Sequence, residues 1–277
     1  MPKFHARVHA ILAKDAKVAI IIRRGPSRSV CTIGWDLRSD TFKLGQWLRG
    51  RIYERRCDIS PDGKHFIYFT LDGKWGSETG GSHSVISKFP YLKAIGLWAK
   101  GSGWNGGGLF MSNSTFWLNS PWYKEQAEMR RPPKMEKLNE FPFKESYGGE
   151  CPGVYYHRLH REGWKMVRDE NGTGDDHIRV FEKVLPKGWI LEKSAHASIN
   201  HLVGKGCYYD THRLLRLENG QVIDCAGWDW VELDRKRLVW AEKGILRAAT
   251  IHGTGLGPVK DLLDLNSMEF EAIAAPY

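Results

Sequence analysis

Short runs of β-forming residues, each ended by a turn, recur along most of this sequence. The first part contains runs at 4–12, 18–24, 30–37 and 41–48, and the next contains runs at 53–60, 65–71, 83–89 and 92–99. Asp62-Gly63 and Asn219-Gly220 carry the strongest hairpin signals, because Asn, Asp and Gly adopt positive φ at little cost. The pattern therefore predicts successive antiparallel hairpins.

The C-terminal third continues the pattern, with runs at 211–217, 222–233, 237–242 and 245–251. Units of about forty to fifty residues with four strands each are typical of propeller blades, which bury both faces only by stacking on neighbours. The 12 tryptophans fit aromatic packing between blades. We predict an all-β fold: a single propeller-like domain over 1–277, an array of four-stranded antiparallel blades. About five blades are expected, with four or six as alternatives.

Two motifs resemble those of known repeat families. DISPDGKHFIYF at 58–69 resembles the hairpin of Tol-type propellers, and TIGWDL at 32–37 resembles the Trp-Asp end of a WD-repeat strand. The ending FEAIAAPY at 270–277 resembles the tail of an uncharacterised bacterial family. The resemblance implies a propeller and brings no activity with it. Residues 267–275 are expected to close the array against an N-terminal strand.

The middle of the sequence departs from the repeat. Residues 120–153 combine an expected short helix at 122–129 with a Pro- and Gly-rich connection. We expect an insertion on one propeller face, the alternative being a linker between two half-domains, with strands resuming at 154–169 and 177–184. Because loops often carry binding function, this segment supplies the predicted partner-binding residues Trp122, Tyr123, Arg130 and Arg131.

Charge, hydropathy and cysteine usage restrict the environment and the partners. The net charge is +9, but the basic residues are dispersed among acids, as on a solvated surface. The N-terminus lacks the pattern of a signal peptide, and no apolar run is long enough to span a bilayer, so we expect a cytoplasmic protein with no membrane partner. The 5 cysteines form no C-x-x-C pair, which favours buried thiols over disulfides or a zinc site.

Residues 101–106 form a literal G-x-G-x-x-G sequence. A dinucleotide site needs a strand before this sequence, a helix beginning inside it and an acid about twenty residues later. Here LFMSNSTFWLN at 109–119 follows, which predicts a hairpin in place of a helix. We therefore predict a turn in which glycine lets the backbone pass close to Trp98 or Trp104, and we expect no cofactor.

No group of residues has the pattern of an established catalytic site. His196, His201 and Asp210 are the weak candidates for acid–base chemistry. Residues five apart on a strand point to opposite faces, so no metal site is expected from the two histidines. Trp228 and Trp230 are expected to share one face of a strand and to pack between blades.

A repeat scaffold without a catalytic group favours a protein that binds another macromolecule, above all a protein, through its loops. Such a scaffold could restrain or sense its partner. The first alternative is a hydrolase or lyase with a pocket on the propeller axis. The second is nucleic-acid binding through a basic face.

Overall fold

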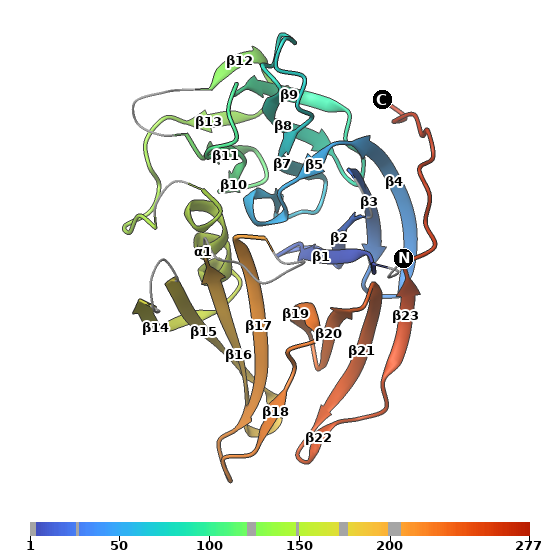
Figure 1. Ribbon diagram of the computed structural model, residues 1–277, viewed down its shortest axis with the longest axis vertical. Coiled ribbons are helices and arrows are strands. Elements are labelled where there is room, and N and C mark those ends of the chain that lie inside the picture. The colour runs from blue at the N-terminus through green and yellow to red at the C-terminus, as the bar shows by residue number, and fades with distance from the viewer. Residues whose placement is uncertain (1–3, 26–27, 121–125, 148–149, 172–176, 199–205) are drawn as a thin grey trace. The chain divides into compact units, whose positions relative to one another are not determined.

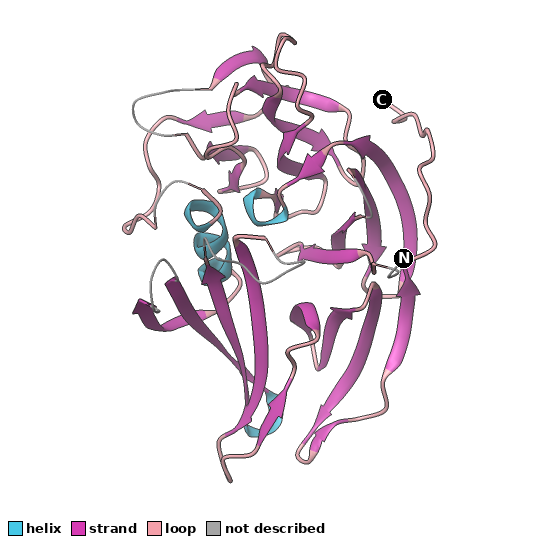
Figure 2. Ribbon diagram, in the orientation of Figure 1, coloured by secondary structure: helices cyan, strands magenta, loops and turns pink. Residues whose placement is uncertain are grey.

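The computed structural model describes residues 4–25, 28–120, 126–147, 150–171, 177–198 and 206–277. Within them the regular secondary structure is almost entirely β, as Figures 1 and 2 show, so the all-β prediction is confirmed. It divides into two compact units. Unit 1 comprises Met1–Phe4, His9–Arg158 and Met268–Tyr277, and unit 2 comprises His5–Val8 and Leu159–Ser267.

Unit 1 contains three of the sheets, apart from Arg7 and Val8 at the start of β1, which belong to unit 2. Sheet A has the strand order β1-β2-β3-β4, with bounds Arg7–Leu12, Val18–Arg24, Ser29–Asp36 and Thr41–Arg49. Sheet B has the order β12-β9-β8-β7-β5, with β6 also paired to β7. Its strands are β5 Arg51–Ile52, β6 Asp58–Ile59, β7 His65–Leu71, β8 Ser82–Lys88, β9 Ala94–Ala99 and β12 Ala127–Arg130, and the 3-10 helix η1, Glu54–Arg56, precedes β6. Sheet C contains β10 Gly108–Phe110, β11 Thr115–Leu118 and β13 Glu136–Leu138.

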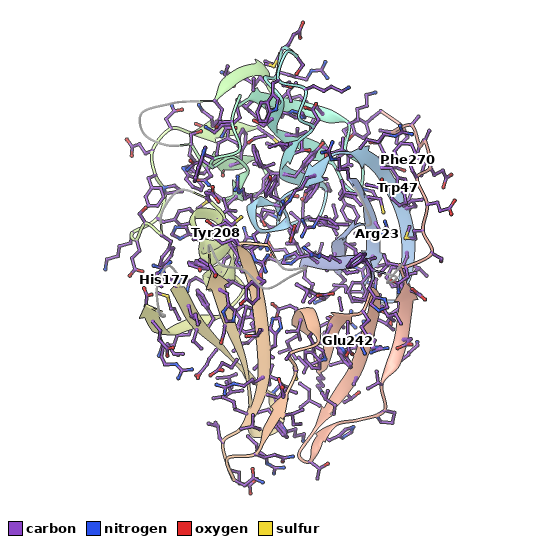
Figure 3. The ribbon with its side chains drawn as sticks, viewed as in Figure 1. Arg23, Trp47, His177, Tyr208, Glu242 and Phe270 are labelled. Atoms are coloured by element: carbon purple, nitrogen blue, oxygen red, sulfur yellow. The ribbon has the colours of Figure 1, made fainter. Side chains whose placement is uncertain are left out.

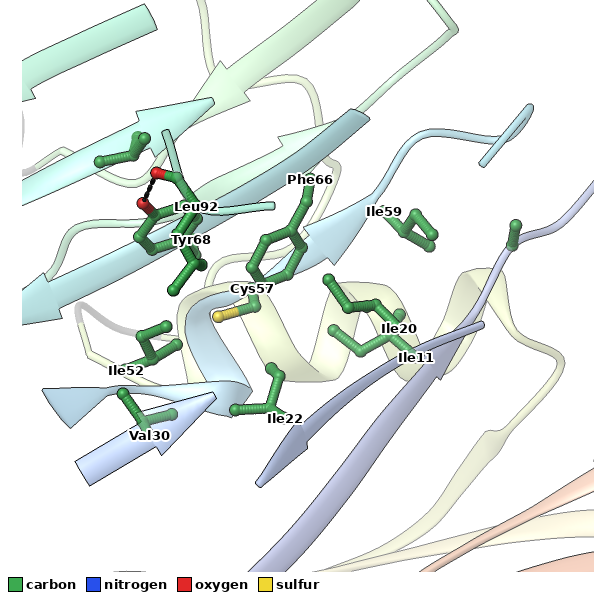
Figure 4. Close-up of a cluster of buried hydrophobic side chains, with 12 residues drawn as sticks. Ile11, Ile20, Ile22, Val30, Ile52, Cys57, Ile59, Phe66, Tyr68 and Leu92 are labelled. Carbon is green, nitrogen blue, oxygen red and sulfur yellow. Dashed lines mark hydrogen bonds between the residues drawn. The ribbon is translucent and has the colours of Figure 1, made fainter. Parts of the chain in front are cut away.

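The strand β7 of sheet B is buried on both faces, because it is apolar at successive positions. Phe66 and Tyr68 belong to a core that also contains Ile20 and Ile22 of sheet A (Figure 4). Ile67, which points to the other face of β7, belongs to a second core with sheet C residues such as Phe116. A strand buried on both sides reads as a continuous hydrophobic run, as this one does.

Unit 2 contains the other two described sheets. Sheet D has the order β14-β15-β16-β17-β18, with bounds Lys165–Asn171, His177–Leu185, Trp189–Ala197, Tyr208–Arg216 and Val222–Asp224. The short 3-10 helix η2, Pro186–Gly188, connects β15 to β16. Sheet E contains β19 Trp228–Asp234, β20 Arg237–Glu242, β21 Ile245–His252, β22 Gly255–Leu256 and β23 Lys260–Asp264.

The described residues thus form five sheets, each made mainly of consecutive strands. The hairpin meander predicted from the turn signals is observed, and sheet C adds one parallel pair, β11 with β13. The predicted turn at 60–64 is built by the Ser60 hydroxyl, which donates to Asp62 Oδ1 at 2.7 Å and accepts from His65 N at 3.0 Å. The propeller arrangement and its blade count stay predictions.

The strand expected at 154–169 is wrong in its first part, because Pro152–Arg161 forms the α-helix α1. Pro152 stands at the first helical position, where a missing N–H costs nothing, and Gly163, with φ of +86°, follows the helix end. These start and stop signals outweigh the β-forming tyrosines between them. The chain becomes a strand only from Lys165.

The helix expected at 122–129 is also corrected. Ala127–Arg130 is the strand β12, which pairs antiparallel with β9 through Ala127↔Ala99 and Glu128↔Trp98. An exposed segment of mixed polarity has little helical preference of its own, and here the open edge of sheet B supplies its backbone partners. Residues 121–125 lie outside the described residues.

Residues 267–275, predicted to close the array against an N-terminal strand, form no strand themselves, and the closure stays a prediction. The tail contacts sheet A through side chains: Phe270 lies 6.0 Å from Trp47, ring centre to ring centre (Figure 3), and Gln46 Nε2 donates to Ile273 O at 2.7 Å. The Tyr277 hydroxyl donates to Lys93 O at 2.7 Å. A side-chain amide and aromatic rings therefore replace a backbone ladder along this segment.

The prediction of buried thiols is confirmed for four of the five cysteines. Cys31, Cys57, Cys151 and Cys225 are buried free thiols, and Cys207 is exposed. No helix among the described residues has the length and apolar character required to cross a bilayer.

Candidate functional site

The glycine-rich loop at 100–107 is bound by a buried arginine. Arg56 Nη1 donates to Gly103 O at 2.7 Å and to Asn105 O at 2.5 Å. The loop therefore turns carbonyl oxygens toward a cation, whereas a phosphate-binding loop turns N–H groups toward an anion. Two of its amides are used within the protein, Gly106 N by Asn119 O and Gly107 N by Ser84 Oγ, each at 2.8 Å.

The glycines of this loop are required by close approach. Gly106 has φ of +84°, and a Cβ there would lie 2.3 Å from Phe69 Cδ2. Gly107 has φ of +73°, and a Cβ there would lie 1.9 Å from Arg56 O. The strand β10 begins at Gly108 and pairs antiparallel with β11, so a hairpin follows the loop, as predicted. The backbone passes beside Phe69 and Arg56 in this turn.

Arg56 is itself held from the other side. Its Nη2 lies 3.3 Å from Glu150 Oε2, its Nε donates to Cys151 Sγ at 3.4 Å, and its guanidinium carbon lies 4.6 Å from the Tyr53 ring centre. Burial alone would lower the pKa of Arg56, but Cys151 and Glu150 raise it above its usual range. The side chain is 2% exposed. A fully charged, fully enclosed guanidinium thus fixes the loop.

The neighbouring Glu54 forms ion pairs with two more arginines. Its Oε1 lies 3.0 Å from Arg24 Nη2 and 3.6 Å from Arg55 Nη1. Burial alone would raise the pKa of Glu54, but Arg24 and Arg55 lower it below its usual range. Glu54 and Arg56 therefore give η1 a network of ion pairs next to the loop.

The connection between β7 and β8, at 72–81, is braced against the glycine-rich loop. Ser82 Oγ donates to Ser102 O at 2.7 Å and accepts from Ser102 N at 3.0 Å. A Cβ on Gly80 would lie 2.9 Å from Gly101 Cα, which shows how closely the two backbones approach. Internal bonds such as Gly73 N to Gly81 O at 3.1 Å fix the first loop further.

Each of these fixed loops presents an exposed tryptophan. Trp75 is 58% exposed and Trp104 is 67% exposed. The indole of Trp75 lies against Gly81, where a Cβ would lie 2.6 Å from Trp75 Cε3. We call the loops 72–81 and 100–107 with these two side chains the tryptophan face. Exposed aromatic residues on ordered loops are typical of recognition surfaces.

The tryptophan face was not predicted from the sequence, although Trp104 was expected at a turn. The available signal was a tryptophan inside each of two segments rich in Gly and Ser, WGSETGG and GSGWNGGG. Such segments have no apolar periodicity, so nothing in them provides a core position for an indole.

Of the predicted partner-binding residues, Arg130 and Arg131 lie outside the tryptophan face. Trp122 and Tyr123 are outside the described residues. Arg130 and Arg131 lie at the end of β12, on the edge of sheet B. Arg130 Nη1 donates to Ala94 O at 3.0 Å, and Arg131 Nε donates to Glu128 Oε1 at 3.0 Å.

The weak catalytic candidates are not brought together in the part of the chain that is described. His201 is outside it. The sheet register pairs His196 with Tyr209 and Ala195 with Asp210, so His196 and Asp210 point to opposite faces of sheet D. His196 stacks on Tyr209 with ring centres 4.4 Å apart, whereas Asp210 is 4% exposed on the buried face.

Asp210 instead belongs to a buried charged group in unit 2. Its Oδ2 lies 3.9 Å from Lys193 Nζ, and Lys193 is paired across the strands with His212. Lys193 Nζ also lies 4.5 Å from the Trp164 ring centre. Trp164 Nε1 donates to Glu232 Oε2 at 2.9 Å. Two carboxylates, a lysine and a histidine thus share one interior.

The prediction for the two tryptophans of β19, in sheet E, is corrected in one respect. A bulge at Asp229 lets Trp228 oppose Glu242 and Trp230 oppose Ala241, which places the two tryptophans on opposite faces. Both are buried, and Trp228 stacks on Trp240 with ring centres 4.7 Å apart. They pack in the interior, as expected.

Among the residues described, no three His, Cys, Asp or Glu side chains are grouped so as to hold a metal ion.

Comparisons with known proteins give structural neighbours alone. No family model matches the sequence, and no curated protein matches it. The crystal structure of the uncharacterized protein lmo1340 from Listeria monocytogenes EGD-e is similar at a TM-score of 0.32 and 9% identity, over 95% of this chain and 84% of that one. A mutant of the GH43 protein BlXynB from Bacillus licheniformis is similar at a TM-score of 0.36 and 12% identity, over 94% of this chain and 55% of that one. Similarity at this level supports no conclusion about the activity of this chain.

Proposed function

We propose that this chain binds a protein partner through the tryptophan face, on a propeller-like scaffold. The observation that carries the proposal is the exposure of Trp75 and Trp104 on loops that are already ordered. Covering the exposed part of one indole, about 100–150 Å², would contribute about 3 kcal/mol. Two indoles would supply much of the roughly 8 kcal/mol of a micromolar complex.

The order of the loops supports the proposal further. Arg56, Glu150 and the serine pair Ser82–Ser102 already fix the backbone that presents the indoles. Binding then orders few additional torsions, so less of the contact energy is lost to conformational entropy. Tryptophan and arginine are also the residues that most often dominate protein interfaces.

Affinity capture from native extract tests the proposal. The wild-type chain is compared with the double variant W75S/W104S and with L217S, a control whose leucine is 68% exposed in unit 2. The same partner should be enriched on wild type and L217S and be lost from W75S/W104S, with circular dichroism confirming that all three fold. A partner retained by the double variant would contradict the proposal.

A hydrolase is the second candidate function, and the buried group around Asp210 is the observation that favours it. A buried carboxylate near a lysine, with a histidine opposite that lysine on the neighbouring strand, is suited to general acid–base work. D210N should abolish turnover of a hydrolysable substrate, whereas H196Q, on the opposite face, should preserve it. A wild-type chain inactive on glycosides, esters and phosphoesters would count against this candidate.

Nucleic-acid binding through a basic face stays a prediction. Several arginines are paired with acids in the described residues, including Arg24 with Glu54 and Arg247 with Asp261. Pairing reduces the positive field available to phosphates. A gel shift at two salt concentrations tests it, and retention of binding that weakens steeply with salt would favour it.

A further inference from the structure

One face of sheet D in unit 2 carries a row of aliphatic side chains that are exposed at its two ends and half-buried between them. The register places Val184 opposite Ile190, Ile190 opposite Leu215 and Leu215 opposite Val222, across β15, β16, β17 and β18. Directly paired residues share a face of the sheet. Val184 is 76% exposed and Val222 is 54% exposed. We call these four residues the aliphatic row.

A row of charged residues crosses all five strands two positions further along the same face. The register pairs Lys165 with Glu182, Glu182 with Glu192, Glu192 with Arg213 and Arg213 with Asp224. From β14 to β18 the signs are therefore plus, minus, minus, plus and minus. We call these five residues the charged row.

The central member of the charged row is already neutralised. Glu192 is 3% exposed, and its carboxylate accepts from Arg168 Nη2 at 3.1 Å and from Arg213 Nε at 2.8 Å. It therefore presents little net charge to a molecule on this face. Arg213 shares its charge with Glu192, so Lys165, Glu182 and Asp224 chiefly decide which surface the face can meet.

The charged row is complementary to itself about a two-fold axis. When a second copy is placed face to face, with the axis parallel to the strands and over β16, β14 of one copy meets β18 of the other. Lys165 then meets Asp224 of the second copy, and Glu182 meets Arg213 of the second copy. The aliphatic rows meet at the same time, with Val184 over Leu215 of the second copy. Aligned packing of two sheets keeps such rows roughly parallel.

We propose that this face of sheet D is the interface of a symmetric homodimer. A second copy is the occupant because the sign pattern pairs each outer charge with its opposite, as an isologous interface requires. The apolar row supplies the area that drives association, and the charged row fixes the register. This interface uses no residue of the tryptophan face.

Charge exchange followed by sedimentation velocity tests the dimer. K165E places a glutamate opposite Asp224, and D224K places a lysine opposite Lys165, so each single variant should raise the dimer Kd by about tenfold. The double variant K165E/D224K restores opposite signs and should return close to the wild-type Kd. A double variant that remains as weak as the singles would overturn the proposal.

The aliphatic row is tested by a matched pair of substitutions. V184S should weaken the dimer, whereas V259S, at a valine that is 53% exposed outside both rows, should leave the Kd unchanged. If the wild-type chain is monomeric at about 100 μM, the proposal is wrong, because even a weak dimer would be populated at that concentration. A dimer that is insensitive to V184S and to the charge variants also overturns the proposal.

Discussion

Two glycines of the same loop allow close approach to be separated from backbone strain. Gly101 has φ of +65° with open space around a Cβ, whereas Gly107 has φ of +73° and a Cβ there would lie 1.9 Å from Arg56 O. Both alanine variants incur the cost of a left-handed backbone, about 1–2 kcal/mol. G107A must also displace the backbone at Arg56 and disturb two bonds, Gly107 N to Ser84 Oγ and Asn119 N to Gly107 O, at about 1 kcal/mol each.

We therefore expect G101A to lower the free energy of unfolding by about 1–2 kcal/mol and G107A by about 3–5 kcal/mol. Urea unfolding followed by far-UV circular dichroism measures both. Hydrogen exchange should show faster exchange of residues 100–107 in G107A than in G101A. Equal losses in the two variants would refute the claim that the loop is held against η1, and with it the argument that these glycines serve packing.

Three further results are expected. E54Q should destabilise the protein by about 3 kcal/mol at pH 7, because Arg24 and Arg55 lose their buried partner. The pKa of Glu54 is lowered in the folded state, so its contribution is present above the unfolded pKa and is lost as pH falls through the folded pKa. Unfolding curves of wild type and E54Q should therefore converge in acid, and a constant gap would contradict this. In the native protein a thiol reagent should modify one cysteine quickly, the exposed Cys207, and C207S should remove that reaction; two fast thiols would be inconsistent with the burial observed. Y277F should speed hydrogen exchange in the C-terminal tail, because the hydroxyl loses two backbone hydrogen bonds of about 1 kcal/mol each, and unchanged exchange would show that the tail is held otherwise.

The sequence predicts most of the strands because their signals are local. Asp62-Gly63 and Asn219-Gly220 stand at turns, and the mainly apolar β7 is buried on both faces. The helix α1 was missed because its tyrosines favour strands, while the decisive signals, Pro152 and Gly163, stand at its two ends. The local β preference of these residues is overridden where the signals at the helix ends and the tertiary packing both favour a helix.

The candidate site could be predicted only in part. The glycine-rich loop was recognised from its spacing, and its role as a turn followed from the hairpin after it. Its partner Arg56 was not predictable, because the contact joins residues about fifty positions apart and depends on how β6 meets β10. The faces of Trp228 and Trp230 were mispredicted, because strict alternation along a strand places residues two apart on one face. The sequence pattern gives no signal for the bulge at Asp229 that breaks this alternation.

Protection mapping of the isolated complex is the most direct measurement of the central claim. Hydrogen exchange of the chain with and without its captured partner should show protection concentrated in residues 72–81 and 100–107, and Trp75 and Trp104 should become protected from oxidation in the complex. Protection confined to other segments, with both indoles as reactive as in the free chain, would contradict recognition through the tryptophan face.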